Sequence, residues 1–183
     1  LHIFMVTSAR KDVIFLTERE LNAAAKSGEL SPRIIKEAPW TSGYSDFAHW
    51  IPKVSSSKGE DTLKRPDGYF LQRVNGKLRK PVAVEIERTI KSRSNYYVEA
   101  LIAVATAARA GYVSPRVVYF APSGTNTMTE LTKALKKIEE SSTMWPQYLP
   151  RVTTEVRDLD QFYESFSTRQ GWIHATPVDT DKS

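Results

Sequence analysis

Two glutamates with the spacing of a strand face stand in the segment VAVEIE that ends at Glu87. Side chains alternate between the two faces of a strand, so Glu85 and Glu87 share one face and the intervening apolar residues share the other. Their Cα atoms would be roughly 6 to 7 Å apart at about 3.3 Å per residue. Two carboxylates this close repel each other unless a positive charge lies beside them.

A third acidic residue, Asp67, precedes the strand that pairs with this segment. Tyr69–Val74 predicts one strand, Asn75-Gly76 is a turn dipeptide, and Pro81–Ile86 predicts the second strand of a hairpin. Because Asp67 and the two glutamates lie far from the turn, strand pairing should gather all three carboxylates at one edge. Such an oxygen cage suits Mg²⁺ or Mn²⁺, and either ion can activate water and neutralise a scissile phosphate.

Basic and aromatic residues follow the acidic strand directly. Arg88, Lys91 and Arg93 stand at the start of the next expected helix, where cations and backbone amides favour phosphate. Tyr96 and Tyr97 come one turn later, where a ring can stack on a base. We therefore expect DNA contacts from these residues and a role for Lys91 beside the metal.

A structural interpretation competes with this chemistry. Glu85 and Glu87 could form a solvent-facing stripe that pairs with the basic residues of the same hairpin, namely Lys77, Arg79 and Lys80. Asp67-Gly68 is also a common turn sequence. The combination of a turn-start Asp, a hairpin, a Glu-x-Glu strand end and a basic helix start favours the functional interpretation.

The N-terminal part predicts a hairpin and a helix. Ile3–Val6 and Val13–Leu16 are short apolar runs, and Thr17 with Glu20 forms a capping box for a helix that Gly28 ends. A winged-helix module ends in this way, although any small hairpin gives the same pattern. We expect residues 1–28 to form this unit, 29–171 the catalytic domain, and 172–183 a flexible tail.

The rest of the chain predicts alternating strands and helices. Residues 29–45 look irregular, because Pro32, Pro39 and Gly43 interrupt them. The elements expected after them are a strand over Phe47–Val54, the hairpin, a helix over Ser94–Ala110, a strand over Val117–Phe120, a helix capped by Thr127 and Glu130, a strand over Val152–Val156, and a helix from Asp158 to Phe166. This order predicts an α/β fold with a mixed central sheet flanked by helices.

The amino-acid composition limits the possible partners, metal ligands and location of the protein. The 183 residues carry a formal net charge of +5, so polyanions are plausible partners. Cysteine is absent, which removes thiolate ligands and leaves oxygen or imidazole to hold any metal. No apolar run reaches the length of a membrane span. We expect a cytoplasmic protein.

Arg65-Pro66-Asp67-Gly68, followed by Val84–Arg88 and Lys91, resembles the core motif of the PD-(D/E)xK nuclease superfamily. The resemblance implies a restriction-endonuclease-like fold in which Asp67 and Glu85 bind metal. Glu87 stands where that motif usually has a lysine. Either Glu87 takes the lysine's role or Lys91 is a relocated lysine.

A narrower resemblance rests on a winged-helix remnant ahead of such a core, with His49 between them. It is similar to the plasmid replication-relaxation proteins and the MOB-C class of mobilization relaxases. It implies metal-dependent nicking of one strand at a plasmid transfer origin, together with relaxosome accessory proteins. Two alternatives stay open: a non-catalytic DNA-binding protein that controls replication or mobilization, and a double-strand restriction-type endonuclease.

The commoner relaxase class, which uses a histidine cluster and a tyrosine nucleophile, does not fit the sequence. Its three histidines, His2, His49 and His174, are far apart. A tyrosine nucleophile at Tyr96 or Tyr97 stays open, although metal-dependent hydrolysis does not need one.

Overall fold

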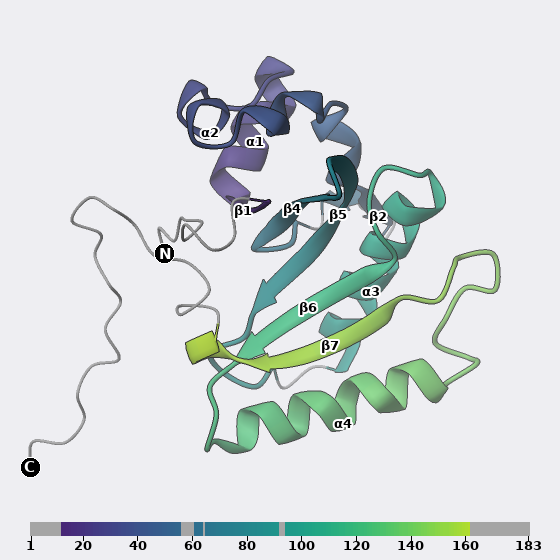
Figure 1. The fold of residues 1–183 in the computed structure, drawn as a ribbon. Helices are drawn as coiled ribbons and strands as arrows, with labels where there is room; N and C mark the ends of the chain where they lie inside the picture. Colours follow the sequence, from purple (N-terminus) through teal and green to yellow (C-terminus); the bar gives the residue numbers. More distant parts are fainter. Residues whose placement is uncertain (1–11, 56–60, 64, 92–93, 162–183) are drawn as a thin grey trace, which may run out of the picture.

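A mixed five-stranded sheet forms the centre of the fold (Figure 1). The computed structural model describes residues 12–55, 61–63, 65–91 and 94–161. The sheet order is β1-β4-β5-β6-β7; β1–β4 and β4–β5 pair antiparallel, whereas β5–β6 and β6–β7 pair parallel. The strands are β1 (Val13–Thr17), β4 (Gly68–Val74), β5 (Lys77–Ile86), β6 (Arg116–Ala121) and β7 (Thr153–Asp158).

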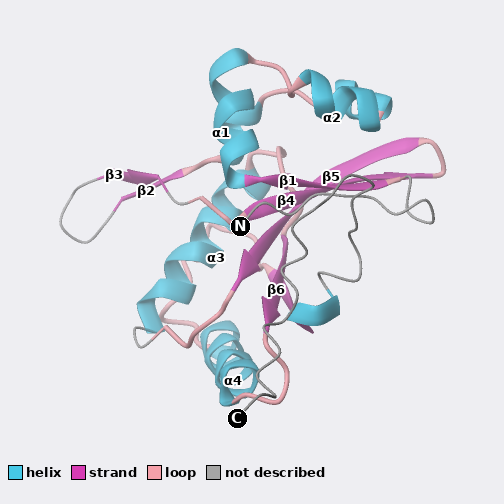
Figure 2. Cartoon of the chain, turned by 90° about the vertical axis from the view of Figure 1, so that its left-hand side faces the viewer, coloured by secondary structure: helices cyan, strands magenta, loops and turns pink. Residues whose placement is uncertain are grey.

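Helices flank this sheet, mainly on one side (Figure 2). They are α1 (Glu18–Ser27), α2 (Pro32–Glu37), the 3-10 helices η2 (Pro39–Gly43) and η3 (Phe47–Trp50), α3 (Ser94–Arg109) and α4 (Asn126–Glu140). The short strands β2 (Lys53–Ser55) and β3 (Asp61–Leu63) form a separate antiparallel pair. The expected α/β class with a mixed central sheet is confirmed, and its assignment as restriction-endonuclease-like stays a prediction.

Two apolar clusters lie on opposite faces of the sheet. The larger one joins Leu71, Ala83 and Tyr119 of the strands to buried side chains of α1, α2, η3, α3 and α4. The smaller one contains Val82 and Val84 of β5 together with aromatic and apolar residues of the other strands. Because side chains alternate along β5, Glu85 and Glu87 fall on the side of the larger, helix-covered cluster.

The predicted β4–β5 hairpin is confirmed. Its turn residues Asn75 and Gly76 have φ values of 53° and 74°, a backbone conformation that asparagine and glycine tolerate best. At the other end of the hairpin Gly68 pairs with Val84. This register places Asp67 beside the carboxyl end of β5.

Gly68 lets β1 approach β4 closely beside Asp67. A Cβ at this position would lie 2.4 Å from the carbonyl oxygen of Leu16 and 2.3 Å from Cζ of Phe15. We expect Gly68→Ala to lower the free energy of unfolding by about 3 kcal/mol, because β1 must shift to make room. Chemical denaturation measures the loss.

Gly124→Ala is the comparison variant for this prediction. No atom lies within 4 Å of its added Cβ, and only its φ of 69° opposes a side chain, so it should cost about 1 kcal/mol. A smaller loss for Gly68→Ala than for Gly124→Ala would contradict the close approach.

The two expected capping boxes have different outcomes. At α1 the box is confirmed: the Glu20 amide donates to Thr17 Oγ1 at 3.3 Å, and Glu20 Oε2 accepts from the Thr17 amide at 3.1 Å. The prediction of a capping box at Thr127 and Glu130 is wrong. Helix α4 begins at Asn126, so Thr127 lies inside the first turn, and Glu130 forms an ion pair with Lys133 at 2.7 Å.

The segment before β4 differs most from expectation. The prediction of a strand over Phe47–Val54 is wrong, because Phe47–Trp50 forms η3 and only Lys53–Ser55 is extended. Phe47 and Trp50, three residues apart, are both buried, with ring centroids 4.9 Å apart. Pro32 does not interrupt the chain but occupies the first turn of α2, behind the N-cap Ser31.

The N-terminal elements share the central sheet and core. β1 pairs with β4, and Leu16 and Leu21 belong to the larger cluster. The expected strand Ile3–Val6 and the tail 172–183 lie outside the described residues, and the boundary at residue 28 is not visible as a break in the core. None of the helices in the described ranges has both the length and the hydrophobicity needed to span a membrane.

Candidate functional site

The two glutamates at the carboxyl end of β5, Glu85 within the strand and Glu87 just after it, are buried rather than facing solvent. Glu85 is 6% exposed and Glu87 is 2% exposed. The basic residues of the hairpin, Lys77, Arg79 and Lys80, are exposed at the opposite end of β5. The interpretation of the glutamates as a solvent-facing stripe paired with these cations is therefore wrong. Burial of two carboxylates carries a large desolvation cost, which proteins usually offset with a proton, a cation or hydrogen bonds.

Asp67 accepts hydrogen bonds from both neighbouring elements, β5 and α1. Its Oδ2 accepts a hydrogen bond from the Ile86 amide at 2.7 Å, and its carbonyl accepts one from the Glu18 amide at 2.9 Å. The first bond holds the carboxylate between Glu85 and Glu87 along the strand. The second joins it to the start of α1. The predicted approach of Asp67 to the end of β5 is thus confirmed.

Asp67 and Glu85 form a hydrogen-bonded carboxyl pair. Burial, followed by the charges of Asp67 and Glu87, raises the pKa of Glu85 well above its usual range. Desolvation of the Asp67 carboxyl group also raises its pKa, although the Ile86 amide opposes this shift. Two carboxyl groups in such contact share a proton unless a cation takes its place.

Lys91 supplies positive charge to this cluster. Its charge lowers the pKa of all three acids, Asp67, Glu85 and Glu87, against the stronger effect of their burial. The Nζ atom lies 5.3 Å from the ring centroid of Tyr96, so this ring helps to position the cation. Lys91 is therefore the cation whose charge acts on all three acids. A relocated lysine is expected to act in this way.

Two buried oxygen atoms at the cluster have no hydrogen-bond partner among the described residues: Oε2 of Glu87 and Oη of Tyr119. Tyr119 stands opposite Glu85 in the parallel pairing of β5 with β6. Burial and the charge of Glu85 raise the pKa of Tyr119, so its hydroxyl keeps its proton. Unpaired buried oxygens indicate a site that water or an ion completes.

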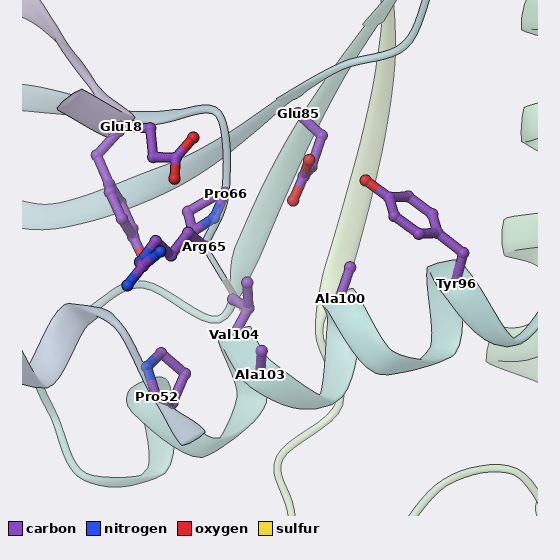
Figure 3. Close-up of a pocket in the computed structure, with 10 residues that line it drawn as sticks. Glu18, Pro52, Arg65, Pro66, Glu85, Tyr96, Ala100, Ala103 and Val104 are labelled. Carbon is purple, nitrogen blue, oxygen red and sulfur yellow. The ribbon is translucent and has the colours of Figure 1, made fainter. Parts of the chain in front are cut away.

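A pocket of about 270 Å³ opens beside the carboxyl pair (Figure 3). Glu85 and Tyr96 face it from β5 and α3, and Glu18 and Arg65 lie across from them. The small side chains of α3 that leave this space open are Ala100, Ala103 and Val104. The carboxyl groups of Glu18 and Glu85, the side chains of Tyr69 and Tyr96, and the guanidinium group of Arg65 thus line one pocket next to the strand end.

Three residues of this site were not among those predicted from the sequence. Glu18 lines the pocket, and its charge helps to raise the pKa of Asp67; in the sequence it is indistinguishable from an ordinary acidic first-turn residue of α1. Tyr119 joins through parallel strand pairing, which no local pattern reveals. Arg65 belongs to the quoted motif, so its position before Asp67 was the available signal.

The remaining predicted site residues lie in different surroundings. Arg88 is exposed, and Arg93 lies outside the described residues. Tyr97 is 1% exposed, and its hydroxyl accepts from the Lys91 amide at 3.4 Å, so its ring packs inside instead of facing a base. His49 stacks on Tyr112, with ring centroids 4.4 Å apart, at the end of α3 opposite Tyr96.

A divalent cation such as Mg²⁺ needs several oxygen donors around one point. Within the described ranges, no group of three or more Asp, Glu, His or Cys side chains is arranged to hold one metal ion. Asp67 and Glu85 still fit such an ion, because a cation would replace the proton that this pair shares. Hard oxygen donors of this kind are those that Mg²⁺ and Mn²⁺ prefer.

Comparisons with known proteins add no assignment. No protein-family model matches the sequence, and neither curated proteins nor solved structures give a significant match.

Proposed function

We propose that this protein is a metal-dependent DNA endonuclease whose centre is the hydrogen-bonded pair of the exposed Asp67 and the buried Glu85. The observation that carries the proposal is the placement of this pair at a strand end, beside a lysine and an open pocket. Packing alone does not require a buried carboxyl group at Glu85 next to a second one at Asp67, and the desolvation of Glu85 destabilises the fold. A site that binds a cation gives a reason to keep them.

Each residue of the cluster has a proposed role. Asp67 and Glu85 would hold Mg²⁺ or Mn²⁺, and the bound ion would supply activation of water and neutralisation of phosphate charge. Lys91 would steady the scissile phosphate, because its charge acts on all three acids. Glu87, with one unpaired buried oxygen, would accept a hydrogen bond from the attacking water.

DNA is the substrate that the surrounding charges support. Arg65, Arg88 and Lys91 are exposed cations near the acidic end of β5, and the chain carries a net charge of +5. Cations around an acidic centre attract the phosphate backbone. The finer proposal, taken from the resemblance to mobilization relaxases, is the nicking of one strand at a plasmid transfer origin with relaxosome accessory proteins.

A plasmid relaxation assay tests this function. Supercoiled plasmid incubated with the protein and Mn²⁺ should become open circles, and omission of the metal should prevent the conversion. A plasmid that carries a transfer origin should be nicked faster than one without it. Linear product in the first turnovers would instead support the double-strand restriction-type alternative. Unchanged supercoiled plasmid under all metal conditions would contradict nuclease activity.

The second candidate function is a non-catalytic DNA-binding protein that controls replication or mobilization. The absence of a three-residue metal group among the described residues favours it. Calorimetric titration with Mn²⁺ distinguishes the two candidates. A nuclease should release heat with about one ion per chain, whereas a binding protein should bind DNA and give no metal-dependent heat.

Lys91 and Glu87, the two candidates for the usual lysine role, can be separated by their effect on pH dependence. Lys91 lowers the pKa of the carboxyl groups, so Lys91→Gln should raise those pKa values and shift the rising limb of the pH–rate profile to higher pH. The maximal nicking rate should fall by about 10- to 100-fold through loss of phosphate stabilisation. Nicking rates at saturating Mn²⁺ measure both effects.

Arg88→Gln is the matched control, because it removes one neighbouring exposed cation that alters none of these pKa values. It should weaken DNA binding and leave the pH profile in place. If Glu87→Gln, rather than Lys91→Gln, displaces the profile and removes most of the activity, then Glu87 takes the lysine's role.

A further inference from the structure

The turn end of the β4–β5 hairpin carries a group of exposed cations that the proposed catalytic site does not use. Lys77, Arg79 and Lys80 are all exposed. In the part of the chain that the structure describes, none of the three forms an ion pair. Val74 and Leu78 beside them are 41% and 36% exposed, which is unusual for such side chains. The hairpin therefore presents unneutralised charge and apolar surface together.

The hairpin is held firmly at its base. The Tyr44 hydroxyl accepts from the Gln72 amide at 3.1 Å and donates toward the carbonyls of Gln72, at 2.9 Å, and Arg79, at 2.7 Å. These contacts lie beside the register shift between Phe70 and Gln72, where the strand ladder is interrupted. Tyr44 thus replaces ladder contacts and keeps the two strands in a defined orientation.

Contacts of the neighbouring residues fix the hairpin further. Leu78 packs close to Gly43, where an added Cβ would lie 2.5 Å from its Cδ1. Arg73 forms an ion pair with Asp12 at 2.8 Å and lies 5.6 Å from the ring centroid of Trp40. Arg73 is therefore already neutralised, and Lys77, Arg79 and Lys80 are the cations of this hairpin that are left for a partner.

The hairpin also has the shape of a nucleic-acid contact. Figure 2 shows the paired ends of β4 and β5 reaching beyond the other strands. A two-stranded ribbon fits into the major groove of DNA, and lysine and arginine side chains on it can reach phosphates on either side. Lys77 and Arg79, two residues apart, share one face of β5.

We propose that the β4–β5 hairpin is a DNA-binding element in which Lys77, Arg79 and Lys80 contact phosphates of duplex DNA. Lys77 precedes Glu85 by eight positions along β5, which is roughly 25 Å at about 3.3 Å per residue. A duplex lying across both would be held about seven base pairs from the acidic centre, at roughly 3.4 Å per base pair. The hairpin and the acidic centre are thus two separate sites.

Binding measured without metal tests the hairpin independently of cutting. Fluorescence anisotropy of a labelled duplex in EDTA gives the affinity of the full chain across about 50 to 200 mM salt. We expect the triple variant Lys77→Ala, Arg79→Ala, Lys80→Ala to bind at least tenfold more weakly. The slope of log affinity against log salt should fall in magnitude by about 2 to 3, since each lost phosphate contact removes about 0.9.

A second triple variant controls for net charge. Lys133→Ala, Lys136→Ala, Lys137→Ala removes the same charge from the exposed face of α4 and should leave the slope almost unchanged. Lys77→Ala alone should lower the slope by about 1, which keeps the test valid if the hairpin triple variant folds poorly.

Three outcomes would overturn the proposal. They are equal losses for the two triple variants, an unchanged slope for Lys77→Ala, or no DNA binding by the wild type. Either of the last two outcomes would indicate that the hairpin cations bind an acidic protein surface instead of DNA. Because no metal is present, none of these results depends on nuclease activity, which the plasmid assay decides separately.

Discussion

Glu85→Gln should lower the rate of Mn²⁺-dependent plasmid nicking by about 100-fold or more. Glutamine keeps the shape of the side chain and can still donate to Asp67, but it cannot supply a charged oxygen to a cation. The variant should bind DNA in EDTA as well as the wild type does, because Glu85 is buried and carries no DNA contact. Loss of cutting with retained binding would locate the defect in the acidic pair.

The same substitution should stabilise the protein without metal. The folded protein raises the pKa of Glu85 above the ordinary value of 4.5, so it holds a proton that the unfolded chain releases. The free energy of unfolding of the wild type therefore falls as pH rises from about 4.5 through the raised pKa. Glu85→Gln lacks this loss, and its melting temperature should exceed that of the wild type at neutral pH but match it near pH 4.

Glu140→Gln is the matched control for both measurements. It removes a carboxylate from the exposed end of α4, where Glu140 pairs with Lys136 at 3.8 Å. Nicking and melting temperature should change little. Comparable nicking by Glu85→Gln and Glu140→Gln would remove Glu85 from the catalytic role.

Mn²⁺ should raise the melting temperature of the wild type, and more strongly at higher pH. Because the ion must replace the proton shared by Asp67 and Glu85, its apparent affinity should increase as pH rises. At about 100 times the dissociation constant, binding adds about 2.7 kcal/mol to the free energy of unfolding. For a chain of this size that corresponds to about 5 to 10 °C.

Thermal unfolding with a Mn²⁺ series at two pH values checks this expectation. The shift should be largest above neutral pH, decrease toward pH 5, and disappear in Glu85→Gln. An equal shift in wild type and variant would place the ion elsewhere. A shift that does not depend on pH would mean that the carboxyl pair is not the binding site.

Local patterns were enough to predict the scaffold of the site. Strand alternation put Glu85 and Glu87 on one face, and the Asn75-Gly76 turn fixed the hairpin register that brings Asp67 beside them. These features follow from backbone geometry over a few residues, so the sequence contains them. The metal, the substrate and the resemblance to nucleases go beyond this geometry and stay predictions.

Other local patterns were ambiguous. The apolar and aromatic residues from Phe47 onward suit a strand or a 3-10 helix equally, and burial of Phe47 and Trp50 against the core selected the helix. Thr127 and Glu130 have the spacing of a capping box, but the chain leaving β6 begins α4 two residues earlier, at Asn126 behind the N-cap Thr125. Contacts formed elsewhere in the fold decided both cases.

By itself, the sequence determined which side chains alternate, where the hairpin turns and which acidic residues lie in register. Only the tertiary structure decided that Glu85 and Glu87 are buried, that Glu18 and Tyr119 join them, and that the hairpin cations stand apart from them. The physical reason is that alternation and turn geometry act between neighbouring residues. Burial and charge proximity depend on which distant elements cover a surface, and no short segment carries that information.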